Sequence, residues 1–288
     1  MSQSRSSRKA LARKTINKDI PSVLQSSSRA KAGVESAQLL TPEPLDTERT
    51  ELKHAAPCII RVVAKDTLDA AHGMLTSRPC AKVGILSMAS ELRPGGGFLS
   101  GANSQEESLC MRTTLYASLS ESFYRLPELG CVYTSDICVF RRHNGEYGMD
   151  TTRPGEWWFV DVISSAAVRG PEIDDNTGGY AYDADRDLMR GKIKVVLRAA
   201  VAQNCRRLVL GAFGCGAFGN PPREVAQLFR RVLLGRPGRN SEFAGCFDEV
   251  TFSILGGRKE SIEEFRAAFS SPDAWVPDKF RPIGMDPA

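Results

Sequence analysis

The chain has 288 residues, of which 42% are hydrophobic, enough for one sizeable domain with extensions or for two small ones. Its formal net charge of +4 is compatible with an anionic ligand but does not by itself indicate a nucleic-acid-binding protein. No hydrophobic run approaches the roughly 18 residues of a membrane-spanning helix, and the three histidines offer no metal-binding cluster.

The first part of the chain is basic, and the first 18 residues contain no acid. This pattern is typical of a solvated helix or a frayed tail, but it also suits a nuclear address or an arm that binds a polyanion. We expect residues 1–55 to form an N-terminal basic extension. Its cations are Arg5, Arg8, Lys9, Arg13, Lys14 and Lys18.

Strand-like and helix-like segments alternate along the rest of the chain, judged from short apolar runs and from apolar faces at helical spacing. This alternation indicates an α/β domain over residues 56–270, and the proline-rich residues 271–288 are expected to form a C-terminal tail. In chain order the predicted elements are strand 58–64, helix 66–75, strand 83–89, helix 105–123, strands 131–140 and 157–164, helix 185–204, strand 207–213, helix 221–234, strand 247–255 and helix 260–269.

Three of these helices begin at recognisable capping residues. Asp66 is expected to cap the first of them. Ser104 is expected to cap the helix that starts at residue 105, with Glu107 completing a capping box. Asn220 is expected to cap the helix that follows it, where proline in the first turn does no harm because its missing N–H is not needed.

Eight cysteines occur in the chain, and no two of them have the CxxC spacing of a redox or zinc motif. Residues 1–20 are polar and basic and do not resemble a secretory leader. We therefore expect free, buried thiols in a reducing compartment. This predicts an intracellular protein of the cytoplasm or the nucleus.

Three consecutive glycines, Gly95, Gly96 and Gly97, follow a predicted strand and precede the adjacent carboxylates Glu106 and Glu107. A backbone without side chains lets a ligand approach its N–H groups closely. Two neighbouring carboxylates repel each other when both are ionised, which favours one raised pKa and acid/base chemistry. An acidic pair in the first turn would also suit the helix dipole without any function. The combination predicts an enzyme that acts on a phosphorylated sugar.

A second strand, glycine loop and helix follow over residues 207–234. Residues 214–219 match GxGxxG, which is weak support for a dinucleotide-binding dehydrogenase. Their late position in the chain and the pair Pro221-Pro222 argue against that interpretation. We expect the two glycine loops to hold a diphosphate between them, because ligands bind beyond the carboxyl ends of strands and at helix N-termini. Two tight turns without a ligand are the alternative.

The segments PGGGFLSGANSQEESLCMRTTLY and LGAFGCGAFGNPPREVA closely resemble the bacterial-type (microbial) poly(ADP-ribose) glycohydrolases. The basic opening SSRKALARKTIN also resembles the N-terminal helical extension of that family, and the resemblance covers roughly residues 6–268. It implies an α/β fold with a macrodomain-like mixed sheet sandwiched by helices. It also implies hydrolysis of ribose–ribose O-glycosidic bonds to release ADP-ribose, without a metal or other cofactor.

The same resemblance implies roles for individual residues. Glu107 matches the catalytic acid/base, and Glu106 matches the partner that orients the ribose hydroxyls. The substrate-binding matches are Gly95, Gly96 and Gly97 in the diphosphate-facing loop, Gln105 in the signature triplet, Gly214, Cys215, Gly216 and Ala217 in the second phosphate loop, Phe218 against the distal ribose, and Asn220 at the following helix start.

Two serines depart from the family pattern. Many members have Asn-x-Ala-Asn before the glycines, whereas this chain has Ser87 and Ser90 at those places. Serine is shorter but can still bond a ribose hydroxyl, directly or through water. The alternatives are therefore a catalytically weak ADP-ribose reader, or a hydrolase of another ADP-ribosyl linkage on protein or nucleic acid.

The partners implied by the resemblance are poly(ADP-ribose), ADP-ribose and ADP-ribosylated proteins or nucleic acid. The same resemblance implies a monomer without a membrane partner, acting in the reversal of ADP-ribosylation and in the DNA damage response.

Overall fold

The computed structural model describes residues 4–44, 58–78, 82–143, 149–236, 238–255, 259–270 and 280–282. The chain groups into two compact units. The first comprises Met1–Leu40, Ser87–Pro127 and Cys131–Ser165, and the second comprises Thr41–Leu86, Glu128–Gly130 and Ala166–Ala288. Strands of both directions occur, with helices packed on them, which confirms the predicted α/β class with a mixed sheet.

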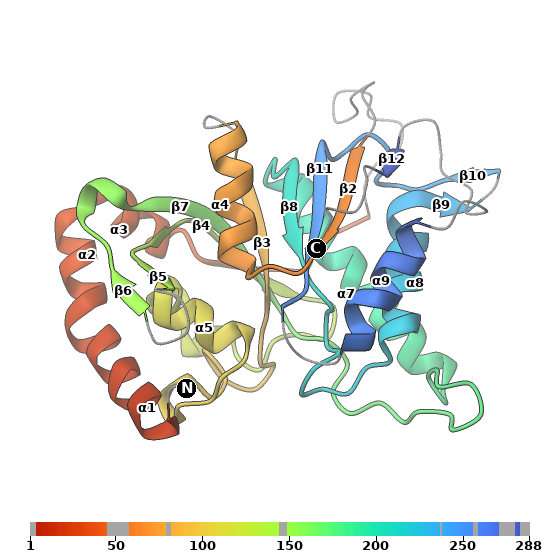
Figure 1. Cartoon of the computed structure of the whole chain (residues 1–288), viewed down its shortest axis with the longest axis horizontal. Helices are drawn as coiled ribbons and strands as arrows, with labels where there is room; N and C mark the ends of the chain where they lie inside the picture. Colours follow the sequence, from red (N-terminus) through yellow and green to blue (C-terminus); the bar gives the residue numbers. More distant parts are fainter. Residues whose placement is uncertain are drawn as a thin grey trace. The chain divides into compact units, whose positions relative to one another are not determined.

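The basic N-terminal segment of the first unit is helical, as expected (Figure 1). Its apolar residues Ile20, Val23 and Ala30 pack into a core with Cys138 and Phe140, so the helices are anchored by burial of apolar surface. The segment consists of α1 (Arg5–Lys14), the π-helical turn η1 (Thr15–Asp19), α2 (Ile20–Ser26) and α3 (Ser28–Glu35).

A buried arginine adds polar contacts to this anchoring. The guanidinium of Arg141 donates to Thr15 Oγ1 at 3.0 Å and to Asp19 Oδ2 at 2.5 Å. Breaking such a buried pair by removing one partner is strongly destabilising, because the other charge is left uncompensated.

The strands of the first unit are antiparallel. β4 (Cys131–Val139) pairs with β7 (Trp158–Ser165) on one side and with β1 (Gln38–Leu40) on the other. β5 (Arg141–His143) and β6 (Met149–Thr151) form a separate hairpin. Sequence analysis predicted β4 and β7 but neither β1 nor the hairpin. These three strands are each three residues long, too short for an alternating pattern to stand out.

The helix predicted over residues 105–123 is wrong in its length. The chain instead forms α5 (Gln105–Arg112), α6 (Leu115–Ser118) and the 3₁₀ turn η4 (Glu121–Phe123). The break occurs because the backbone at Thr114 bonds to strand β4: its N–H donates to Cys138 O at 3.0 Å, and its Oγ1 accepts from Cys138 N–H at 3.1 Å. Tertiary pairing overrides helix propensity here.

In the second unit, strands that are parallel to one another run side by side in one sheet (Figure 1). Strand β12 lies in the predicted C-terminal tail, and the rest of residues 271–288 falls outside the described residues. The order is β3 (Val83–Met88), β8 (Arg207–Leu210), β11 (Glu249–Ser253), β2 (Cys58–Val63) and β12 (Phe280–Pro282), with the last two residues of β3 belonging to the first unit.

Four helices of the second unit connect or flank these strands. α7 packs on α8, α8 packs on α9, α9 contacts β2, and α4 contacts β8 and β11. The cap at Asp66 is confirmed, because its carboxylate accepts from the N–H groups of Leu68 and Asp69. The helices are α4 (Thr67–Ser77), α7 (Asp183–Ala202), α8 (Pro222–Leu234) and α9 (Lys259–Ser270).

Two further expectations can be followed in the described part of the chain. Within it, no helix combines the length and the apolar character needed to cross a membrane. All of its cysteines are free and buried, as predicted, while Cys80 lies outside the described residues.

Candidate active site

Two adjacent carboxylates in the first turn of α5 are both buried. Glu106 is 3% exposed and Glu107 is 5% exposed. Removing a carboxylate from water costs free energy, so an acidic pair that served only the helix dipole would stay at the surface. The burial therefore favours a chemical role for this pair over the purely structural interpretation.

Glu107 closes the predicted capping box, which the structure confirms. Its Oε2 accepts from the N–H of Ser104 at 3.0 Å and from the hydroxyl of the same serine. Its Oε1 accepts from the N–H of Gly97 at 2.8 Å. Both carboxyl oxygens therefore act as hydrogen-bond acceptors. One side chain thus joins the helix start to the glycine loop.

Glu106 is held differently. Its Oε2 accepts from the N–H of Ser90 at 2.9 Å, whereas its Oε1 is buried without a partner among the described residues. Burial raises the pKa of Glu106 to about 8, and the neighbouring charge of Glu107 adds to this, while the N–H groups of Ser90 and Gly95 oppose it. At neutral pH Glu106 consequently keeps its proton, and its unpaired oxygen is available for a ligand.

The glycine loop lies close to these carboxylates, and Gly96 is the position at which a side chain would meet both of them. Gly95 and Gly96 have φ values of +63° and +55°, which side-chain-bearing residues rarely adopt. A Cβ at Gly96 would lie 2.7 Å from Glu106 Oε2 and 3.0 Å from Glu107 Oε1. The N–H of Gly96 donates to Arg93 O, and that of Gly97 to Glu107. The backbone of this loop was expected to face a phosphate. In this structure the N–H of Gly97 instead donates to a glutamate carboxylate.

Gln105 and the two serines lie around the same helix start. The Oε1 of Gln105 accepts from the N–H of Met88 at 2.9 Å, which ties the end of β3 to α5. The side chain of Ser90 accepts from the N–H of Leu92 at 3.2 Å. Ser87 is 0% exposed, and its hydroxyl has no partner among the described residues. The structure thus supplies one unused buried hydroxyl near the place where a ribose contact was expected.

Tyr124 is a candidate residue that sequence analysis missed. Its hydroxyl is buried without a hydrogen-bond partner among the described residues. Burial raises the pKa of this tyrosine, and the charge of Glu106 raises it further, so its hydroxyl stays protonated. The second effect shows that Tyr124 interacts electrostatically with Glu106. No sequence motif pointed to Tyr124, because it follows a segment that was predicted to be one continuous helix.

The second glycine loop lies between β8 and α8 in the second unit. Gly214 has a φ of +75°, and a Cβ there would lie 2.4 Å from the Cβ of Ala167 and 2.5 Å from the amide nitrogen of Asn220. The amide of Asn220 donates to Val168 O at 2.6 Å and to Gly214 O at 3.1 Å.

Asn220 therefore fixes the loop rather than capping the helix. Its Oδ1 accepts from the hydroxyl of Tyr180 at 2.8 Å, so its side-chain amide is used within the unit. The N-cap position of α8 is occupied by Pro221, without a side-chain hydrogen bond, so the predicted cap at Asn220 is wrong. The local sequence pattern predicted that the Asn220 side chain caps the helix, but in the structure this side chain forms buried hydrogen bonds to Tyr180, Val168 and Gly214 instead.

The tip of the second loop is open. Gly216 and Ala217 are exposed, and within the described residues no hydrogen bond comes from the N–H groups of Gly216, Ala217 or Phe218. Successive free N–H groups in a turn suit an anion. The guanidinium carbon of Arg169 lies 4.3 Å from the centroid of the Phe218 ring. The Cys215 side chain is buried.

The structure thus brings the residues predicted in the first unit together around the start of α5, and it forms the loop 214–220 in the second unit. That the two loops hold one diphosphate stays a prediction. Within the described ranges, no group of three His, Cys, Asp or Glu side chains is arranged to hold a metal ion.

The buried state of Glu106 predicts a pH-dependent stability. The unfolded carboxyl ionises near pH 4.5, whereas the folded one holds its proton up to about pH 8. The free energy of unfolding of the wild type therefore decreases as pH rises from 4.5 to about 8, by as much as about 5 kcal/mol, and the contribution of this group is fully present below pH 4.5. In urea denaturation, Glu106→Gln should gain stability relative to the wild type between pH 5 and 8.

The exposed Glu121 provides the matched control, since Glu121→Gln should follow the wild-type pH dependence. Parallel curves for wild type and Glu106→Gln over that range would contradict the raised pKa.

Comparison with known proteins gives a consistent result. The family described as microbial-type PARG, catalytic domain, matches residues 9–142. A search of curated proteins found no match. The poly(ADP-ribose) glycohydrolase of Thermomonospora curvata is similar in structure, with 30% sequence identity and a TM-score of 0.73, over 92% of this chain and 100% of that one.

Ligand-bound structures are also similar. The T. curvata enzyme bound to the inhibitor ADP-HPD matches with 30% identity and a TM-score of 0.70, over 92% of this chain and 98% of that one. The enzyme of Deinococcus radiodurans in complex with ADP-ribose matches with 27% identity and a TM-score of 0.65, over 84% of this chain and 97% of that one.

Proposed function

Because this chain belongs to the microbial-type poly(ADP-ribose) glycohydrolase family, we propose that it hydrolyses the ribose–ribose O-glycosidic bonds of poly(ADP-ribose) and releases ADP-ribose. The observation that supports this activity most is the buried pair Glu106 and Glu107, in which burial raises the pKa of Glu106 to about 8 and one carboxyl oxygen of Glu106 has no partner among the described residues. Glycoside hydrolysis requires both a protonated carboxyl group and an ionised one.

The proposed reaction transfers one proton from the pair to the leaving group and regains one proton from water. The proton that Glu106 holds passes to Glu107, which donates it to the oxygen of the leaving ribose as the bond from the anomeric carbon to that oxygen breaks, through an oxocarbenium-like state. The carboxylate that results takes a proton from water, whose oxygen bonds to the anomeric carbon. One water is consumed, and the pair ends in its starting protonation state.

Glu106 is proposed to orient the substrate during these steps. Its unpartnered Oε1 is the acceptor or donor through which ribose hydroxyls would be bound. Ser90 N–H fixes the other oxygen, so the carboxyl group is already oriented before substrate binds. The free N–H groups of Gly216, Ala217 and Phe218 support phosphate binding by the second loop.

The activity is tested by incubating the protein with purified poly(ADP-ribose) and separating the products by chromatography. We expect ADP-ribose to accumulate with time and the polymer to shorten. Binding of ADP-ribose without any release would instead support the reader alternative, which the serines at positions 87 and 90 motivate. Release only from singly modified protein or nucleic acid would support a hydrolase of another ADP-ribosyl linkage.

A further inference from the structure

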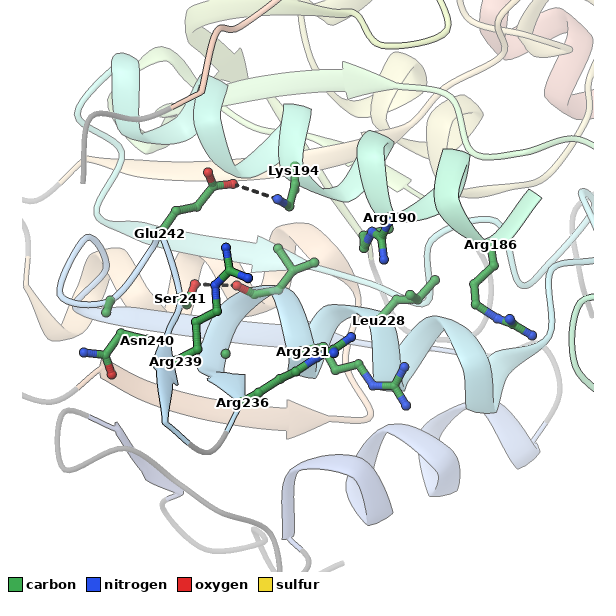
Figure 2. Close-up of a pocket in the computed structure, with 13 residues that line it drawn as sticks. Arg186, Arg190, Lys194, Leu228, Arg231, Arg236, Arg239, Asn240, Ser241 and Glu242 are labelled. Carbon is green, nitrogen blue, oxygen red and sulfur yellow. Dashed lines mark hydrogen bonds and ion pairs between the residues drawn. The ribbon is translucent and has the colours of Figure 1, made fainter. Parts of the chain in front are cut away.

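A basic groove lies in the second unit, between α7, the second half of α8 and the hairpin formed by β9 (Gly235–Arg236) and β10 (Arg239–Asn240). Its volume is about 710 Å³. Figure 2 shows its side chains projecting from these three elements. Its only acidic lining residue is Glu242, and its cations are Arg186, Arg190, Lys194, Arg231, Arg236 and Arg239.

Three of the cations lie along α7, and the other three come from α8 and the hairpin. Arg186, Arg190 and Lys194 are four residues apart on α7, so they lie on one face at intervals of about 6 Å. Arg231 comes from α8, and Arg236 and Arg239 come from the hairpin. Side chains from three separate elements therefore direct positive charge at one space, which raises the local potential for an anion.

Three of these cations form ion pairs within the described part of the chain. Arg186 pairs with Glu224 at 3.1 Å and with Asp183, Arg190 pairs with Asp187 at 3.0 Å, and Lys194 pairs with Glu242 at 3.6 Å. These pairs are partly exposed, and such pairs contribute little to stability and exchange readily.

By contrast, the described part of the chain offers no ion-pair partner to Arg231, Arg236 or Arg239, and all three are exposed. Three unneutralised guanidinium groups around one groove leave it with a charge that only an external anion would balance.

The lining indicates which anion fits. No aromatic side chain is among the lining residues, whose apolar members are Leu228, Val232 and Ala244. Proteins that bind single-stranded nucleic acid generally stack bases on aromatic rings. A groove without such rings recognises phosphate charge alone, which guanidinium groups bind in bidentate fashion.

We propose that this groove is an accessory site for the diphosphate groups of poly(ADP-ribose), remote from the unit that is hydrolysed. The inference rests on the proposed function, since it adds a second contact with the same polymer. Helix α8 connects the two places: it begins at Pro222, just after the second glycine loop, and Arg231 lies about 14 Å further along the helix. A polymer held by its end at the loop would extend to the groove.

The test removes the three unpaired arginines together, as Arg231→Gln, Arg236→Gln and Arg239→Gln in a Glu107→Gln background that preserves the polymer during the measurement. Affinity is measured by fluorescence anisotropy with labelled poly(ADP-ribose), with monomeric ADP-ribose and with single-stranded DNA of equal phosphate count. The matched control removes three exposed cations of the same unit that do not line the groove, Lys65, Arg78 and Lys82, by the same change to Gln.

We expect the groove variant to bind the polymer at least about tenfold more weakly, with the slope of log affinity against log salt concentration reduced by about 2 to 3. The loss for monomeric ADP-ribose should be far smaller, and the control should bind like its parent. An equal loss in the control, or no loss in the groove variant, would overturn the proposal. So would DNA binding as tight as polymer binding and equally dependent on the three arginines, since the occupant would then be nucleic acid.

The experiments distinguish a failure of the proposed hydrolase activity from a failure of the proposed accessory site. If the wild type releases no ADP-ribose but polymer binding still depends on the groove, the proposed hydrolysis is wrong and the accessory site stands. If the wild type releases ADP-ribose and the groove variant binds polymer like its parent, only the accessory site is wrong.

Discussion

Glu107→Gln is expected to lower kcat for release of ADP-ribose from poly(ADP-ribose) by about 10²- to 10⁴-fold. Glutamine has nearly the same shape, but its amide cannot donate a carboxyl proton to the leaving oxygen or accept one from water. The initial rate is measured by chromatography at saturating polymer, and ADP-ribose affinity is measured on the same preparation.

The substitution also has a structural effect that must be separated from the chemical one. Glu107 accepts hydrogen bonds at both oxygens, and an amide nitrogen at one of them would leave Gly97 or Ser104 N–H without an acceptor. This costs about 1–3 kcal/mol of stability. Glu156 is a suitable control, because it closes another capping box by accepting from Arg153 N–H at 2.9 Å.

Glu156→Gln should therefore lose stability modestly and keep its activity. A wild-type rate in Glu107→Gln would reject the acid/base assignment. Activity that survives in Glu107→Gln and disappears in Glu106→Gln would show that Glu106, not Glu107, is the acid/base. The comparison is informative because Glu106 is the glutamate with the raised pKa.

Gly96→Ala is expected to reduce both activity and stability, with kcat/KM falling at least about tenfold and the free energy of unfolding falling by about 1–3 kcal/mol. The residue has a φ of +55°, and an added methyl group would approach both catalytic candidates closely, at 2.7 Å from Glu106 Oε2 and 3.0 Å from Glu107 Oε1. Backbone strain and displacement of the carboxylates act together, so both quantities change.

Gly73→Ala is the matched control. Gly73 lies within helix α4, and a Cβ there would meet nothing within 4 Å. Alanine should therefore stabilise this helix by about 0.5–1 kcal/mol without affecting the rate. Steady-state kinetics and urea denaturation of both variants provide the measurements. Unchanged kcat/KM in Gly96→Ala would show that the loop does not position the carboxylates.

Much of the fold was predictable from local pattern. Apolar runs located the parallel strands except β12, which lies in the segment predicted to be a tail, and helical spacing together with the cap at Asp66 located most helices of the second unit. Two of the failures share one cause. The predicted helix over residues 105–123 is interrupted because Thr114 bonds to Cys138, a residue 24 positions away. The predicted cap at Asn220 is absent because its amide is used by Val168, Gly214 and Tyr180. Long-range hydrogen bonds decided both.

The sequence by itself determined the α/β class, the family resemblance and the identity of the paired glutamates behind three glycines. Only the tertiary structure decided that both carboxylates are buried, that Glu106 Oε1 lacks a partner, that Tyr124 adds an unpaired hydroxyl, and that cations from α7, α8 and a hairpin surround one groove. The physical reason is that desolvation and electrostatic potential depend on every neighbouring atom, including those far away in the chain. Residue types and spacing specify which groups are present, whereas packing specifies their protonation, partners and exposure.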